Sequence, residues 1–252
     1  MTLLNVQNLT VKRGECPVVD RASFNISSGE CVGLIGPNGA GKTSLLRGAM
    51  GLLPFEGTST LADLSPRHRA AQAAWLPQTR EIAWPMSVER IVALGRLPYL
   101  ARGARLSPAD QSAVDAALTR MGLQNFRTRL ATALSGGEQA RVLIARTLAQ
   151  DTPLLMADEP IAGLDPAAQI ATLQVFETLA QEGRAALTSL HDLTLAARYC
   201  TRLIMMRAGS IIADGPPRDV LTPDSLADVF RLKADVIDTP LGLVVQPWGV
   251  IA

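Results

Sequence analysis

The residues with the plainest chemical potential form a glycine-rich stretch, Gly36-Pro37-Asn38-Gly39-Ala40-Gly41-Lys42-Thr43. It fits the pattern G-x-x-x-x-G-K-[ST], in which glycines let successive backbone N–H groups point at phosphate oxygens. Lys42 can then reach the β- and γ-phosphates of a nucleotide, and the hydroxyl of Thr43 can ligate magnesium. Because an apolar run at 31–35 precedes the stretch and a helix-compatible run at 43–52 follows it, the sequence predicts a phosphate-binding loop.

Adjacent carboxylates, Asp158 and Glu159, come directly after an apolar run at 154–157. In an extended segment neighbouring side chains point in opposite directions, so one carboxylate can hold magnesium while the other orients the attacking water. We assign Asp158 to magnesium and Glu159 to the general base, since phosphoryl transfer needs mostly positioning and charge stabilisation. The alternative is a polar strand end that Pro160 terminates, and the phosphate loop makes this alternative the weaker one.

A helix is predicted to begin within 134–139, where Ser135 and Glu138 have the spacing of a capping box. Gly136 and Gly137 also bare the N–H groups of that helix N-terminus, as in many anion sites. From the residues alone, an ordinary helix cap and a second anion site fit equally well.

Polar side chains follow other short apolar runs. His191 comes after the strand predicted over 185–190 and can contact a γ-phosphate, although a lone histidine is more often structural. Gln78 ends the strand predicted over 75–78 and can bind magnesium or water. His68 lies between two arginines, where we expect a solvated surface.

A sheet must bring these residues together. Apolar runs alternate with helix-compatible segments from 31 to 200, which predicts a parallel sheet with helices on both faces. Ligands bind outside the carboxyl ends of the strands in such sheets, so we expect the strand ends at Ile35, Ala157 and Leu190 to form one site. Residues 3–28 alternate in the manner of half-buried strands.

Length and composition narrow the class of protein. The 252 residues are 48% hydrophobic, which suits one large domain with a packed core. A net charge of +1 gives no broad basic field, so we expect no nucleic-acid partner. The scattered cysteines Cys16, Cys31 and Cys200 fit a reducing cytosol. The sequence shows neither a signal peptide nor an apolar run of about 18 residues, so we expect any membrane role to come through a partner.

Taken together, these segments resemble the ATP-binding subunit of an ABC transporter over essentially the whole chain. The family's elements occur in their usual order: Walker A at 36–43, the Q-loop at Gln78, the signature at 134–139, Walker B at 154–159, the D-loop at 163–165 and the H-loop at His191. The resemblance implies an α/β fold, with a P-loop NTPase (RecA-like) core, an N-terminal antiparallel β subdomain and an inserted helical subdomain. In this division, 1–78 and 134–252 form the core with its β subdomain, and 79–133 form the helical subdomain of a single ABC ATPase domain.

The resemblance also implies roles for particular residues, with ATP and magnesium as the ligands. It assigns catalysis to Glu159, His191 and Gln78, and magnesium to Thr43, Gln78 and Asp158. It assigns ATP binding to Gly36, Pro37, Asn38, Gly39, Ala40, Gly41, Lys42, Thr43, Ser44 and Arg13. Two copies stacked head to tail would add, from the second copy, Ser135, Gly136, Gly137, Gln139 and Asp165.

The chain departs from the family at two positions. Arg13 stands where relatives usually carry an aromatic residue that stacks on adenine, and its guanidinium plane can stack instead. Ala140 stands where many relatives have glutamine, and we expect little effect from this change.

Within the family, the segments 94–99, 145–150 and 191–199 resemble ATPases of importers for iron–siderophore, haem or cobalamin, with iron–siderophore as the first expectation. This implies a homodimer at the cytoplasmic face of the inner membrane and separate membrane permease subunits. An extracytoplasmic substrate-binding protein would take part indirectly. The permease would dock on the helical subdomain, where Trp84 and Leu100 are candidates for the edge of a groove near Gln78.

The main alternative is a soluble ABC ATPase of DNA repair, chromosome structure or translation. DNA-maintenance relatives carry very long coiled coils between the Q-loop and the signature, whereas this interval has roughly 55 residues without sustained heptads. Translation relatives usually hold two cassettes in one chain. The import-type segments disfavour an export or lipid-transport cassette, and Glu159 with His191 disfavours a module that binds nucleotide without hydrolysing it.

Overall fold

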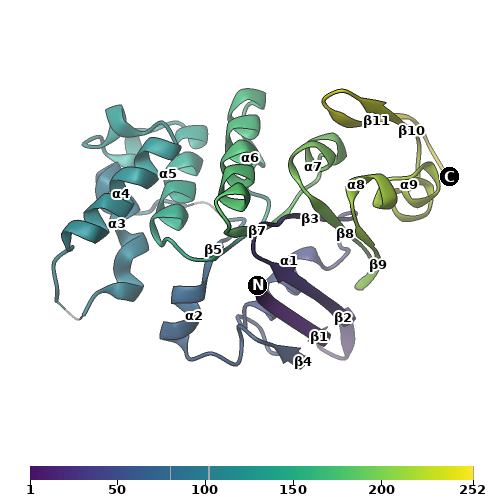
Figure 1. The fold of residues 1–252 in the computed structure, drawn as a ribbon, viewed down its shortest axis with the longest axis horizontal. Coiled ribbons are helices and arrows are strands. Elements are labelled where there is room, and N and C mark those ends of the chain that lie inside the picture. The colour runs from purple at the N-terminus through teal and green to yellow at the C-terminus, as the bar shows by residue number, and fades with distance from the viewer. Residues whose placement is uncertain (80, 102, 252) are drawn as a thin grey trace.

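The computed structural model describes residues 1–79, 81–101 and 103–251. Figure 1 shows a central sheet with a helical lobe at one end, an antiparallel sheet beside it and a terminal hairpin at the other end. The central sheet has the strand order β5-β6-β7-β3-β8-β9. Its strands are β5 (Ala73–Leu76), β6 (Leu154–Ala157), β7 (Ala185–Ser189), β3 (Cys31–Ile35), β8 (Arg202–Arg207) and β9 (Ser210–Gly215).

In the order of the sheet, β5, β6, β7, β3 and β8 pair in parallel, and β9 pairs with β8 as an antiparallel edge strand. The register places Leu76 opposite Ala157 and Ala157 opposite Thr188, so the carboxyl ends of β5, β6 and β7 meet at one edge. Leu34 of β3 pairs with Ser189, which brings the end of β3 to the same edge. The predicted parallel sheet is confirmed, and its strand ends meet as expected.

Side chains on both faces of the central sheet are buried, as β3 illustrates. Cys31 and Ile35 belong to one apolar cluster, whereas Val32 and Leu34 belong to the other. The first cluster lies under α5 (Gly136–Ala149), α6 (Pro166–Gln181) and α7 (Leu193–Tyr199).

The second face of the sheet departs from the prediction of helices on both faces. Its cluster contains α1 (Lys42–Ala49), but most of the cover comes from an antiparallel sheet. This sheet has the order β2-β1-β4 and consists of β1 (Thr2–Arg13), β2 (Cys16–Ser27) and β4 (Glu56–Ser59). The short strands predicted within 3–28 are therefore two long strands with bulges, whose alternating apolar residues face the central sheet.

The helical lobe contains α3 (Val88–Ala93), a 3₁₀ segment η1 (Leu94–Tyr99) and α4 (Pro108–Arg120), followed by the 3₁₀ turns η2 (Gln124–Phe126) and η3 (Ala131–Ala133). A nearly buried ion pair joins η1 to α4 within the lobe, and its arginine also bonds to α5 of the core. Arg96 Nε lies 2.9 Å from Asp110 Oδ1, and Arg96 Nη1 donates to Ala149 O at 2.9 Å. Ile91 is buried in the lobe, whereas Trp84 is 73% exposed. The apolar residues of this region are thus divided between core and surface.

The remaining elements are α2 (Pro66–Gln72), α8 (Pro217–Val220), α9 (Pro223–Phe230), β10 (Leu232–Thr239) and β11 (Gly242–Val250). Residues 217–230 form two helices, because Thr222 caps a new helix whose first residue is Pro223. The strands β10 and β11 pair in an antiparallel terminal hairpin. Across the described residues, we find no helix with both the length and the apolar character needed to cross a bilayer.

Candidate active site

The phosphate loop joins β3 to α1 and is shaped by close backbone contacts. A Cβ atom on Gly41 (φ 100°) would lie 2.4 Å from Val18 O, and one on Gly36 (φ 152°) would lie 2.4 Å from Met206 O. Only glycine fits at these two positions. Among the described residues no side chain caps α1 at Gly41, so its first N–H groups are placed to meet an anion.

A hollow of about 210 Å³ lies over this loop. Its lining includes Arg13 at the end of β1, Val18 of β2 and Glu159. It also includes Asn38, Gly39, Ala40, Gly41, Lys42, Thr43 and Ser44. The structure therefore brings Arg13 to the predicted nucleotide site, although it lies far from the loop in sequence.

The Lys42 side chain is buried within the loop. Its Nζ donates to Gly36 O at 2.6 Å and to Pro37 O at 3.0 Å. Burial lowers the pKa of Lys42, and the nearby carboxylates of Glu159 and Asp158 oppose that shift. The ammonium group is thus held at the loop by two carbonyl oxygens that it can exchange for phosphate oxygens.

Asp158 follows β6 and is 1% exposed. Its Oδ1 accepts a hydrogen bond from Ser189 Oγ at 2.7 Å, while its Oδ2 is buried and has no hydrogen-bond partner in the described part of the chain. A buried carboxylate oxygen without a donor is costly unless something else binds it. Together with the Thr43 hydroxyl in the neighbouring hollow, this oxygen fits a magnesium ion with oxygen and water ligands.

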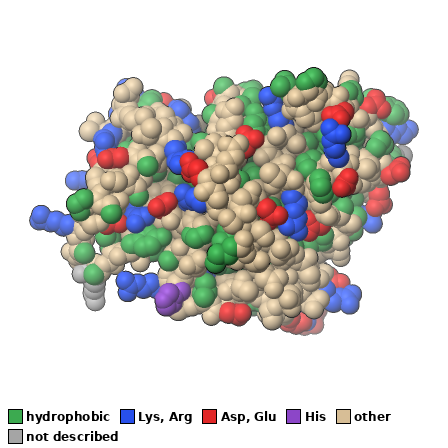
Figure 2. Space-filling view, viewed as in Figure 1, with side chains coloured by type: hydrophobic (Ala, Val, Ile, Leu, Met, Phe, Trp, Pro, Cys, Tyr) green, Lys and Arg blue, Asp and Glu red, His purple; other side chains and the backbone are tan. Residues whose placement is uncertain are grey.

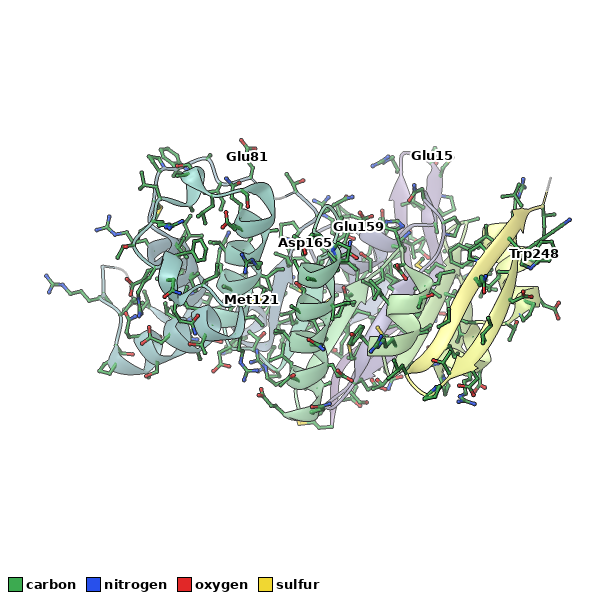
Figure 3. All side chains as sticks on the ribbon, turned by 90° about the horizontal axis from the view of Figure 1, so that it is seen from above. Glu15, Glu81, Met121, Glu159, Asp165 and Trp248 are labelled. Carbon is green, nitrogen blue, oxygen red and sulfur yellow. The ribbon has the colours of Figure 1, made fainter. Side chains whose placement is uncertain are left out.

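Glu159 lies within hydrogen-bonding distance of the other two predicted catalytic side chains, Gln78 and His191. Its Oε2 accepts from Gln78 Nε2 at 2.9 Å, and its Oε1 lies 2.7 Å from His191 Nε2. Gln78, Glu159 and His191 follow β5, β6 and β7, so the aligned strand ends bring them together. Figure 3 draws Glu159 between Asp165 and the β1–β2 turn that Glu15 marks.

The extended conformation predicted around Asp158 and Glu159 is wrong for Glu159. Glu159 has φ 50°, in the left-handed region that non-glycine residues seldom adopt. Its backbone N–H donates to Ser189 Oγ at 2.8 Å. Sequence reasoning missed Ser189, whose only signal was that the buried strand β7 ends on two hydroxyl residues, Thr188 and Ser189.

The signature turn lies at the start of α5, on the lobe side of the molecule. Ser135 is the N-cap and forms the predicted capping box with Glu138, whose pKa is lowered by the hydrogen bonds from Ser135. A Cβ on Gly136 would meet nothing within 4 Å, so the backbone is open there. Gln139 Nε2 donates to Leu134 O at 3.1 Å within the same turn. The cap is confirmed, and the open glycine backbone leaves room for an anion beside it.

A second, larger hollow of about 690 Å³ borders this turn. Ser135, Gly137 and Asp165 line it, with Arg120 and Arg141 at its sides. Asp165 is the N-cap of α6 and accepts from Ala168 N at 2.9 Å. Within the described residues, the linings of the two hollows share no residue, so a single chain keeps the phosphate loop and the signature turn apart.

Comparison with known proteins identifies the family. The sequence profile of the ABC transporter family matches residues 19–162. The chain is 40% identical over 244 residues to the cobalamin import ATP-binding protein BtuD of Halobacterium salinarum, covering 94% of this chain and 61% of that one. It is 41% identical over 249 residues to the hemin import ATP-binding protein HmuV of Pseudomonas fluorescens, covering 94% and 96% of the two chains.

Solved structures share the fold. An ATP-binding subunit of an ABC transporter superposes with a TM-score of 0.77 at 30% identity, over 87% of this chain and 92% of that chain. The ATP-binding cassette MJ0796, solved as a dimer in a post-hydrolysis state with ADP and Pi, superposes with a TM-score of 0.74 at 26% identity. That match covers 85% of this chain and 99% of the other.

Proposed function

This chain belongs to the ABC transporter family, and from that membership we propose that it is the ATP-hydrolysing subunit of an importer for haem, cobalamin or another metal chelate. The observation that carries the proposal is the joining of Gln78, Glu159 and His191 by hydrogen bonds beside the phosphate loop. This set provides the groups that γ-phosphoryl transfer to water needs.

Nucleotide binding follows from the loop. The N–H groups at the start of α1 and the ammonium of Lys42 would receive the β- and γ-phosphates once Lys42 leaves Gly36 O and Pro37 O. Thr43 and the unpartnered Oδ2 of Asp158 would hold magnesium, which supplies charge neutralisation to the phosphates when bound. Arg13 would stack its guanidinium plane on the adenine.

Hydrolysis would use Glu159 as the general base. Both of its carboxylate oxygens are engaged, one by Gln78 and one by His191, at hydrogen-bonding distance. A water attacking the γ-phosphate would replace one of these partners, and Glu159 would then accept its proton. His191 would move its hydrogen bond from Glu159 to the γ-phosphate, which keeps that phosphate in line with the water.

A second copy would complete the site. The separation of the two hollows supports an arrangement in which Ser135, Gly137 and Asp165 of one chain face the phosphate loop of the other. The related cassette MJ0796, which was solved as a dimer, supports a dimer of this chain. The open backbone of Gly136 and Gly137 would then receive the γ-phosphate at a helix N-terminus, while the capping box remains in place.

The membrane partner and the cargo are further parts of the proposal. We infer a position at the cytoplasmic face of the inner membrane, with a permease docked on the helical lobe, where Trp84 is exposed. Acidic and basic side chains are interspersed over the face drawn in Figure 2, which agrees with a protein partner rather than nucleic acid. The names of the relatives favour haem or cobalamin over the iron–siderophore expected from sequence.

Two experiments test these parts separately. Purified chain incubated with ATP and magnesium should release phosphate, and Glu159→Gln should bind ATP but lower the rate by at least about a hundredfold. Similar rates for both proteins would remove Glu159 from the base role. Tagged chain isolated from gently solubilised native membranes should carry a polytopic permease with it. If only soluble proteins or nucleic acid co-purify reproducibly with the tagged chain, the result would instead favour a soluble ABC ATPase.

A further inference from the structure

Ser189, the last residue of β7, connects the two carboxylate residues of the site. Its hydroxyl donates to Asp158 Oδ1 at 2.7 Å and accepts from Glu159 N at 2.8 Å. The side chain is fully buried, at 0% exposure. One hydroxyl group therefore contacts both residues to which the proposed function gives chemical roles, and it does so away from solvent.

The sheet register explains why this residue reaches both of them. Ala157 pairs with Thr188 across β6 and β7, so the residues that follow, Asp158 and Ser189, lie side by side. The preceding residue gives a useful contrast. Thr188 is equally buried, but its Oγ1 has no hydrogen-bond partner in the described part of the chain. The two buried hydroxyls are adjacent in sequence, but only that of Ser189 contacts the site.

The contacts have consequences for each partner. By donating to Oδ1, Ser189 fixes the rotation of the Asp158 carboxylate and leaves Oδ2 as the oxygen without a donor among the described residues. By accepting from the backbone N–H of Glu159, it supports that residue in its left-handed conformation at φ 50°. The Glu159 side chain is then directed to Gln78 and His191.

We propose that Ser189 is a positioning residue that holds Asp158 ready for magnesium and Glu159 ready for water. The inference rests on the proposed function, because it assigns these two carboxylates their roles in ATP hydrolysis. It adds to the site a residue that contacts both Asp158 and Glu159. Removing the hydroxyl should weaken the response to magnesium and slow the chemical step, while the phosphate loop stays intact.

The test compares Ser189→Ala with Thr188→Val, which removes the neighbouring buried hydroxyl, for which the described residues provide no hydrogen-bond partner. Binding of a fluorescent ATP analogue is measured in EDTA and across a magnesium titration, together with phosphate release by the full chain. For Ser189→Ala we expect unchanged affinity in EDTA, a magnesium midpoint raised about fivefold and a kcat lowered about tenfold with little change in KM. For Thr188→Val we expect wild-type values throughout, because no hydrogen bond is lost.

Each other outcome has a definite meaning. Equal loss of affinity with and without magnesium, or a large fall in the unfolding temperature, would make Ser189 a general structural residue and overturn the inference. A magnesium midpoint and kcat equal to those of the wild type would also overturn it, while leaving the proposed ATPase untouched. If the unsubstituted chain neither binds the analogue nor releases phosphate, the proposed function itself fails and the inference fails with it.

Discussion

Replacing Lys42 by methionine separates its role toward nucleotide from its role in the fold. Methionine keeps an unbranched apolar stem but removes the ammonium group, which donates to Gly36 O and Pro37 O. Burial lowers the pKa of Lys42, so the folded surroundings disfavour its charge on balance. Losing the two hydrogen bonds is therefore offset by losing a buried charge, and we expect the free energy of unfolding to change by only about 1 kcal/mol.

The effect on nucleotide affinity should be much larger. Hydrogen bonds to charged groups contribute about 1.5–3 kcal/mol each, and two such contacts to phosphates give at least about 3 kcal/mol. This corresponds to an affinity lowered more than about a hundredfold. The matched control is Lys233→Met, which removes the same charge from the terminal hairpin, where Lys233 Nζ lies 5.9 Å from the Trp248 ring centroid. It should bind as the wild type does.

The assay is a titration of the full chain with a fluorescent ATP analogue, paired with urea unfolding of each variant without nucleotide. An affinity of Lys42→Met within about threefold of wild type would refute the argument from the loop. If Lys42→Met instead loses several kcal/mol of unfolding free energy, its weaker binding would follow from a disrupted loop, and the assignment of Lys42 to phosphate binding would lose its support.

Three further variants test separate features of the structure. Gly41→Ala should lower the free energy of unfolding in urea by more than about 2 kcal/mol, because its Cβ would lie 2.4 Å from Val18 O. Gly39→Ala should lower it by only about 1 kcal/mol, because its Cβ would meet nothing within 4 Å. Equal losses of unfolding free energy in the two variants would argue against the close contact between residue 41 and Val18 O. Arg13→Ala should lower ATP affinity about fivefold and reduce the preference for ATP over GTP, and Arg13→Tyr should restore both; a wild-type preference in Arg13→Ala would exclude stacking. Asp110→Asn should be less stable than wild type at neutral pH. Hydrogen bonds from Ser107 and the charge of Arg96 lower the pKa of Asp110 from 3.8 to about 2, so its stabilisation is complete above pH 3.8 and is lost as the pH falls through about 2. The urea midpoints of Asp110→Asn and wild type should converge over that interval, and a constant difference would argue against an ionised Asp110 as the source.

Local patterns in the sequence were sufficient for the phosphate loop and for the strand ends. The glycines, Lys42 and Thr43 are contiguous, and the apolar runs that precede Asp158 and His191 are short and distinct. Because parallel strands align their carboxyl ends, placing these residues in one site required only the order of elements along the chain. The capping box at Ser135 was equally local, since its two members are three residues apart.

Features that depend on register were not predictable in the same way. Ser189 contacts Asp158 across 31 positions in sequence, and a shift of one residue between β6 and β7 would separate them. The left-handed conformation of Glu159 has no signal in the residue type, because glutamate seldom adopts it. The alternation within 3–28 does not reveal which surface those strands bury, and the antiparallel sheet itself was expected only from the family resemblance.

In the dimer that we propose, two copies of this chain enclose ATP between the phosphate loop of one and the signature turn of the other. We would measure the mass of Glu159→Gln by light scattering, with and without ATP, because slow hydrolysis should preserve the closed state. We expect twice the mass of the single chain with ATP, one ATP bound per chain, and a return to the single-chain mass when Gly137→Asp adds a carboxylate at the turn. A nucleotide-bound Glu159→Gln that keeps the single-chain mass at every ATP concentration would contradict it.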